Sequence, residues 1–130
     1  MARIVLENLT KNFGNVKAVD NVGLEIEDKE FVTLLGPSGC GKTTTLRMIA
    51  GLEAPTSGKI YFDGKAVNDV PPHKRNVAMV FQDYALYPHM NAFQNIAFSL
   101  SMRKIPETEI REQVTNTARL LRIEHLLERM

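Results

Sequence analysis

The sequence predicts an α/β fold, and three observations support this. Segments with the spacing of strands dominate the first 81 residues, whereas helical spacing begins near Asn91. Two short apolar runs, at residues 31–35 and 77–81, lack the alternation of half-buried strands, which is typical of strands covered on both faces of a parallel sheet. Between these runs, a glycine-rich segment leads directly into a helical pattern. The switch in pattern predicts a core rich in strands, followed by a helical part.

The N-terminal residues have the pattern of two half-buried strands. Ile4, Leu6 and Leu9 lie among polar residues, and a second, near-alternating series covers residues 19–26. The polar stretch between them, residues 11–17 with Gly14, is expected to form a turn. Farther along, residues 58–67 predict a hairpin, because two short β-rich segments flank the turn pair Asp63-Gly64.

Helical spacing is found at residues 42–50 and again after residue 91. The first of these segments is expected to end at Gly51, because glycine readily adopts the left-handed conformation that closes a helix. In the C-terminal part, Pro106 suits a first helical turn, and Ile110, Val114 and Leu121 follow at helical spacing.

Composition narrows the class of protein. The 130 residues carry a net charge of +1, with 44% hydrophobic and 24% charged residues, so no nucleic-acid partner is predicted. The single cysteine, Cys40, excludes an internal disulfide. Neither a secretory signal nor an apolar run of about 18 residues is found, so we expect a cytoplasmic chain whose membrane role requires a partner.

The glycine-rich segment matches the phosphate-loop pattern G-x-x-x-x-G-K-[ST], also called Walker A. Glycines let the backbone curl so that successive N–H groups point at phosphate oxygens, and the following helix adds its N-terminal N–H groups and dipole. The predicted nucleotide-binding residues are Gly36, Pro37, Ser38, Gly39, Cys40, Gly41, Lys42, Thr43 and Thr44.

Two side chains of this loop have predicted roles of their own. Lys42 is expected to place its ammonium on the β and γ phosphates and so to act in catalysis. The Thr43 hydroxyl is expected to coordinate Mg²⁺, which prefers hard oxygen ligands. Cys40 is expected to be a small filler residue without a catalytic role. The alternative interpretation of the whole segment is an ordinary glycine-rich turn.

A polar pair, Gln82 and Asp83, follows the second apolar run. From the chemistry of these residues alone, Asp83 is a possible Mg²⁺ ligand, Gln82 is a possible ligand or water-orienting group, and both are equally explained as polar residues at an exposed strand end.

The sequence resembles the ATP-binding subunits of ABC transporters, especially those of sugar importers. The resemblance covers nearly the whole chain and rests on residues 36–44, 46–52, 55–58, 80–89 and 95–98. It implies that Gln82 contacts Mg²⁺ or the attacking water and couples the site to a membrane subunit, whereas Asp83 is not a metal ligand. It also implies that Phe13 stacks on adenine. One departure is Gln94, because the family often has glutamate at that position.

The resemblance implies a P-loop NTPase core with an N-terminal antiparallel β subdomain and the beginning of a helical subdomain. The expected domains are residues 1–89, which end after the Gln82 loop, and residues 90–130. The family's LSGGQ signature, Walker B strand and switch histidine do not occur in the sequence, so the chain is expected to be an N-terminal fragment with little or no hydrolysis of its own. Expected ligands and partners are ATP, Mg²⁺, transmembrane permease subunits and, in the full-length protein, a second copy.

Other classes of function fit less well. A GTPase is expected to contain D-x-x-G after a core strand and N/T-K-x-D for base recognition, and a nucleotide kinase is expected to contain an arginine-rich lid. The sequence has none of these in a suitable place. A third alternative is a nucleotide-binding piece without transport function.

Overall fold

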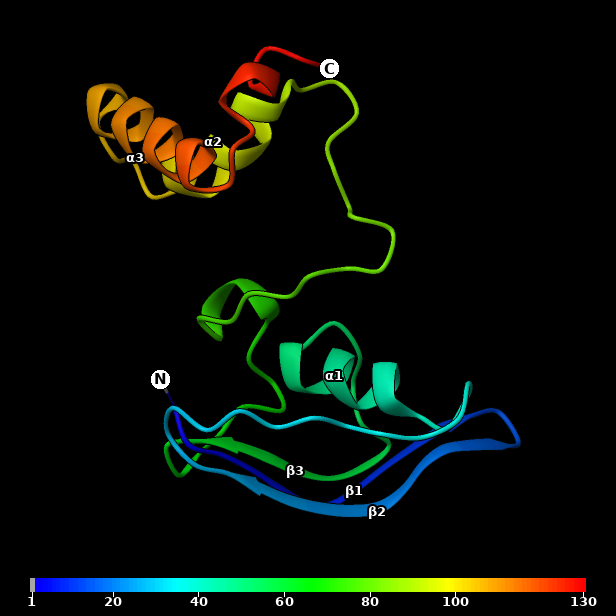
Figure 1. Cartoon of the computed structure of the whole chain (residues 1–130). Helices are drawn as coiled ribbons and strands as arrows, with labels where there is room; N and C mark the ends of the chain where they lie inside the picture. Colours follow the sequence, from blue (N-terminus) through cyan, green and yellow to red (C-terminus); the bar gives the residue numbers. More distant parts are fainter. Residues whose placement is uncertain (1) are drawn as a thin grey trace. The chain divides into compact units, whose positions relative to one another are not determined.

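The computed structural model describes residues 2–130, which form two compact units (Figure 1). The first unit ends at Met79 and the second runs from Val80 to Met130. The first contains a sheet, a helix and the short 3-10 helix η1 (Pro72–Lys74). The second contains only helices and connecting segments.

The sheet of the first unit is antiparallel throughout, with the strand order β2-β1-β3-β4. Leu6 of β1 lies opposite Leu24 on one side and Ile60 on the other, so apolar side chains of three strands meet in one row. The strands are β1 (Ile4–Phe13), β2 (Val16–Ile26), β3 (Ser57–Phe62) and β4 (Lys65–Ala66).

One face of the sheet is covered by α1 (Lys42–Ala50) (Figure 1). Its Met48 is fully buried against strand residues. Helix α1 has the predicted bounds and ends as expected at Gly51, which adopts a left-handed conformation with a φ of 79°. The core of the unit comprises Leu6, Leu9, Val19, Met48, Ile60 and Val67.

The antiparallel character of the N-terminal region and the hairpin are confirmed. Asp63 and Gly64 have φ values of 49° and 76°, and positive φ at both residues is what a type I′ hairpin turn requires. The first turn is shorter than predicted, because β1 and β2 continue into the polar stretch and leave only Gly14 and Asn15 between them.

The prediction of a buried strand at residues 31–35 and at residues 77–81 is wrong. Neither run is a strand, and Phe31 and Val80 are 92% and 93% exposed. A strand needs neighbours for its backbone N–H and C=O groups. The sheet formed by residues 2–130 consists of β1 to β4, and neither run pairs with any of its strands. Apolar composition alone therefore does not produce the strands.

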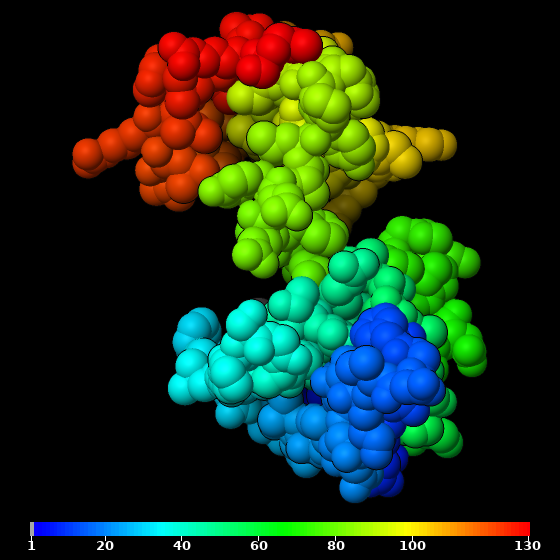
Figure 2. Space-filling model, turned by 90° about the vertical axis from the view of Figure 1, so that its right-hand side faces the viewer, coloured from blue at the N-terminus to red at the C-terminus, as the bar shows by residue number. Residues whose placement is uncertain are grey.

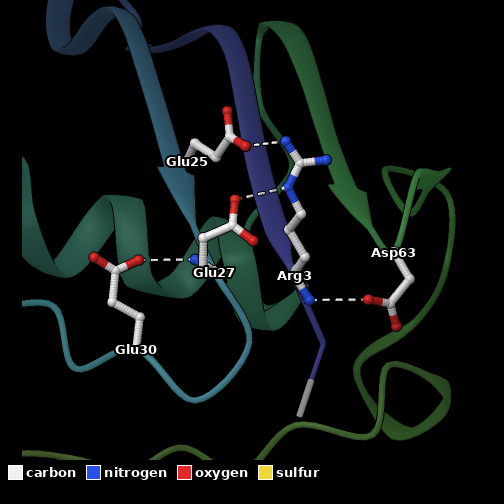
Figure 3. A network of polar contacts seen from close by, with 5 residues as sticks. All are labelled: Arg3, Glu25, Glu27, Glu30 and Asp63. Atoms are coloured by element: carbon white, nitrogen blue, oxygen red, sulfur yellow. Dashed lines mark hydrogen bonds and ion pairs between the residues drawn. The ribbon is translucent and has the colours of Figure 1, made fainter.

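A polar network connects the residue before β1, the end of β2 and the β3–β4 turn (Figure 3). Arg3 pairs through its guanidinium with Glu25, and with Glu27 at 3.2 Å, while its backbone amide donates to the Asp63 carboxylate at 2.9 Å. The Glu30 carboxylate accepts from the Glu27 amide at 2.8 Å. The network lies on the exposed surface, so its role is to align strand ends rather than to supply much stability.

The second unit packs α2 (Ala92–Met102) against α3 (Glu107–Leu120), followed by the 3-10 helix η2 (Glu124–Leu126). Asn91 and Gln94 form a capping box at the start of α2. The glutamine amide oxygen thus accepts the backbone bond that a glutamate carboxylate makes in such a box. The buried residues are Ala97, Ile110, Val114, Ala118 and Leu127.

No helix formed by residues 2–130 has both the length and the apolar character needed to cross a lipid bilayer.

Candidate functional site

The phosphate loop lies between residues 31–35, which form no regular element, and α1, and its backbone at Gly41 lies very close to β2. Gly41 is the residue before the helix, with a φ of 91°. A Cβ atom at this position would lie 2.2 Å from the Ala18 carbonyl oxygen and 3.2 Å from a methyl of Val19. Glycine is therefore required at residue 41 by both its conformation and its close approach to the strand.

The first turn of α1 presents backbone donors at the loop. The first bond of the helix runs from the Thr45 amide to the Gly41 carbonyl at 2.8 Å, so the amides of Lys42, Thr43 and Thr44 precede the bonded part of the helix. No acidic residue lies in this turn. Together the amides and the helix dipole make this end attractive to an anion.

Lys42 closes the loop across its own backbone. Its ammonium donates to the carbonyls of Gly36 and Pro37, each at 2.7 Å, and lies 3.4 Å from the Cys40 sulfur. One positive charge is thus held within the curl of the loop. Residues 36–40 are exposed, and the cyan region of Figure 2 lies on the surface of the first unit.

A hollow of about 420 Å³ lies between the loop and β2. Lys42, Cys40 and Thr45 line it from the loop and helix, and Lys17 and Asp20 line it from the strand. Its volume lies within the range of small-molecule sites.

The loop region offers an oxygen ligand suited to a magnesium ion that is also bound by the phosphates of a nucleotide. Thr43 is exposed in the first turn of α1 and offers a neutral hydroxyl oxygen. Among residues 2–130, no three His, Cys, Asp or Glu side chains group into a metal site. A hydroxyl oxygen is among the hard oxygen ligands that Mg²⁺ accepts.

Phe13 ends β1 and is 48% exposed, so its ring is not a core residue. The Lys11 ammonium lies 4.9 Å from the ring centroid. Lys11 did not stand out in the sequence. The available signal was its spacing, since residues two apart on a strand share a face.

Gln82 is exposed and belongs to the second unit, whereas the phosphate loop belongs to the first. Its place beside the nucleotide stays a prediction. The loop that follows it is organised by Asn95, which accepts from the Tyr87 amide at 2.8 Å and donates to the Met90 carbonyl at 3.0 Å. The ring of Tyr87 packs on Phe98, with centroids 4.6 Å apart. In contrast, Tyr84 and Leu86 are largely exposed.

Comparison with known proteins agrees with this geometry. The family model described as "ABC transporter" matches residues 19–130. The chain belongs to the ABC transporter family. Its fold matches two solved structures of the cassette MJ0796. The dimeric bacterial ABC transporter cassette is 31% identical, with a TM-score of 0.86, and the post-hydrolysis dimer bound to ADP and Pi is 30% identical, with a TM-score of 0.84. The chain is covered to 96% in both comparisons and spans 60% of each solved chain.

Curated relatives are more similar in sequence. The trehalose/maltose import ATP-binding protein MalK of Thermococcus litoralis is 55% identical over 135 residues, and the ABC transporter ATP-binding protein YurJ of Bacillus subtilis is 52% identical over 129 residues. Each match covers 99% of this chain, which spans 36% and 35% of the lengths of these relatives.

Proposed function

We propose that this chain binds MgATP as part of the ATP-binding subunit of an ABC importer, whose hydrolysis of ATP drives uptake of a solute. The observation that carries the proposal is the loop itself: a curl closed by the Lys42 ammonium lies directly before the unbonded amides of α1. This combination of donors is suited to a triphosphate.

In the proposed complex, the phosphates replace the carbonyls of Gly36 and Pro37 as partners of the Lys42 ammonium. The backbone of residues 36–44 surrounds the phosphate oxygens, and Thr43 would hold Mg²⁺ together with Gln82. The metal supplies charge neutralisation to the transferred phosphoryl group. Lys42 contributes a second positive charge, which stabilises negative charge on the β and γ phosphates.

The whole subunit is proposed to act as a homodimer attached to permease subunits at the inner face of the membrane. Residues 1–89 would form the β subdomain and nucleotide core, and residues 90–130 would begin the helical subdomain. The dimeric cassettes of MJ0796 support dimerisation, and the import proteins among the relatives support permease partners and a sugar as solute. The exposed Tyr84 and Leu86 are suited to contact a permease.

The test is a calorimetric titration of MgATP into the chain and into its Lys42→Ala variant. We expect binding by the chain and loss of tight binding by the variant, with an unchanged far-ultraviolet circular dichroism spectrum. Lys65→Ala is the matched control, because Lys65 is an exposed lysine in β4 of the same sheet. Normal MgATP binding by Lys42→Ala would contradict the proposal, and a strong preference for GTP over ATP would favour the GTPase alternative.

A further inference from the structure

Lys11 is held unusually firmly for a lysine in a surface sheet. Its ammonium lies 2.6 Å from a Glu53 carboxylate oxygen and donates to the Ala54 carbonyl at 2.7 Å. Its side chain is only 13% exposed. Lysine side chains lose much rotamer freedom when they are fixed in this way. The same ammonium lies over the ring of Phe13, at 4.9 Å from the centroid.

This arrangement fixes one face of the Phe13 ring. A cation over an aromatic face is attracted to the ring, so rotation of the ring away from Lys11 has an energetic cost. Almost half of the Phe13 surface remains exposed. One face of the ring therefore lies against a positive charge, and the exposed part of Phe13 is accessible to a flat ligand.

The contacts of Lys11 also connect the ring to the phosphate loop. Glu53 and Ala54 follow directly after the closing turn of α1, the helix that begins in the loop. On the other side, Lys11 lies opposite Val19 in the β1–β2 pair, and Val19 is among the residues close to Gly41. The Phe13 ring is thus linked through the Lys11 side chain to the segment that follows the helix, and through strand pairing to the residue beside Gly41.

We propose that Lys11 is a positioning residue for base stacking: its ammonium, fixed by Glu53 and the Ala54 carbonyl, holds the Phe13 ring so that its open face receives adenine. The inference rests on the proposed function, since it assumes that the loop binds the phosphates of the same nucleotide. A ring held in place before binding loses less freedom when the base arrives, which strengthens binding.

The test separates base binding from phosphate binding. Isothermal titration calorimetry is performed on the chain with two probes, MgATP and the magnesium complex of inorganic triphosphate, which has no base. We expect Lys11→Met to weaken MgATP binding about threefold to tenfold, as expected for loss of one cation–π contact, and to leave triphosphate binding unchanged within about twofold. The control Lys65→Met removes a lysine from β4 and should change neither affinity.

Two further variants show whether Lys11 acts through the ring. In a Phe13→Ala background, Lys11→Met should cause no additional loss of MgATP affinity, whereas Lys11→Arg in the natural background should retain most of it. If Lys11→Met does not fold, Glu53→Gln keeps the ammonium but loosens its anchoring. This variant should give a smaller loss with the same selectivity for MgATP.

The outcomes are distinct. If the unaltered chain binds neither probe, the proposed function fails and the inference fails with it. If the chain binds both probes, each of three results would overturn the inference alone. The first is an unchanged MgATP affinity in Lys11→Met, or in Glu53→Gln if Lys11→Met does not fold. The second is an equal loss of affinity for both probes, and the third is a loss of MgATP affinity that persists in the Phe13→Ala background.

Discussion

Arg75 is a buried cation on which the stability of the first unit is expected to depend. It is 6% exposed and its guanidinium donates to four backbone carbonyls, those of Asn68, Val70, Met48 and Ile49, at 2.7–3.2 Å. Two of these carbonyls belong to the last turn of α1, where helical carbonyls have no partner within the helix. Arg75 therefore joins the phosphate-loop helix to the segment that precedes η1.

The cost of removing this group follows from its partners. Arg75→Met keeps an unbranched side chain but removes the Arg75 donors from four carbonyls, of which that of Met48 keeps the Gly51 amide at 3.1 Å. Each carbonyl left unsatisfied costs about 1–3 kcal/mol when it stays buried. In the opposite direction, methionine brings no charge into the interior, whereas burying a charged group costs several kcal/mol. This part of the substitution stabilises the folded state. Burial indeed lowers the pKa of the Arg75 guanidinium from its ordinary value. We expect a net destabilisation of about 2–5 kcal/mol.

Urea unfolding followed by circular dichroism measures the change in the free energy of unfolding. Hydrogen exchange read by mass spectrometry locates it, and protection should fall first in α1 and at residues 68–75. Arg75→Lys should lose about half as much free energy of unfolding as Arg75→Met, because the single lysine nitrogen has three donors for four separated carbonyls. A loss below about 1 kcal/mol in Arg75→Met would refute the reasoning, since it is smaller than the cost of one unsatisfied carbonyl.

A second variant tests the same contact. A Cβ at Gly51 would lie 2.6 Å from the Arg75 Nε atom, and Gly51 has a positive φ. Gly51→Ala should therefore destabilise the natural chain more than it destabilises Arg75→Met, in which the clash is relieved. Equal destabilisation in the two backgrounds would mean that the clash contributes nothing.

The remaining predictions concern the loop. Gly41→Ala should abolish MgATP binding and lower the unfolding midpoint in urea, because the added Cβ meets the Ala18 carbonyl; unchanged binding would show that the loop moves freely from β2. Alkylation of the exposed Cys40 by N-ethylmaleimide should block MgATP binding by filling the loop, and ATP should slow the reaction, as measured by mass spectrometry; full alkylation with unchanged affinity would contradict this. Gln82→Ala should leave ATP binding without magnesium unchanged and reduce the gain in affinity on adding Mg²⁺; an equal gain in both proteins would exclude Gln82 as a ligand. The chain alone should release phosphate from MgATP very slowly, because it lacks the LSGGQ signature and Walker B strand, so sustained turnover in a phosphate-release assay would contradict its expected inactivity.

Local sequence signals predicted local structure well. The bounds of α1 and the turn at Asp63-Gly64 were predictable because each depends on a few neighbouring residues: a glycine that ends a helix and a pair that adopts positive φ. The phosphate loop belongs to the same class. Its glycines at residues 36, 39 and 41 adopt positive φ directly before α1, as the short pattern predicts, whereas its binding role stays a prediction.

The two apolar runs were mispredicted for the opposite reason. Their apolar composition suits a strand that is covered on both faces, but a strand forms only when neighbouring strands supply hydrogen bonds. Phe31 and Val80 are exposed, and neither run pairs with the sheet formed by residues 2–130. Lys11 and Arg75 were missed for a related reason. The contacts of Lys11 with the segment after α1 span 42 and 43 residues of sequence, and those of Arg75 with the last turn of α1 span 26 and 27. No local sequence pattern reports such contacts.

These two overlooked cations explain how a short loop motif becomes a defined site. The motif specifies which amides and which ammonium would face the phosphates of the proposed ligand, but it does not determine where the helix behind them lies. Arg75 bonds the last-turn carbonyls of α1, and Lys11 bonds the turn after it. Arg75 thereby fixes the end of the helix that is remote from the loop, whereas the bond of Lys11 lies beyond the helix and holds the ammonium over the Phe13 ring. Since a helix is stiff over its nine residues, fixing that end also restricts the direction in which its first amides point. Loss of either cation should therefore alter the site without changing any residue of the motif, and the triphosphate probe distinguishes the two: Arg75→Met should weaken binding of both probes, whereas Lys11→Met should weaken only that of MgATP.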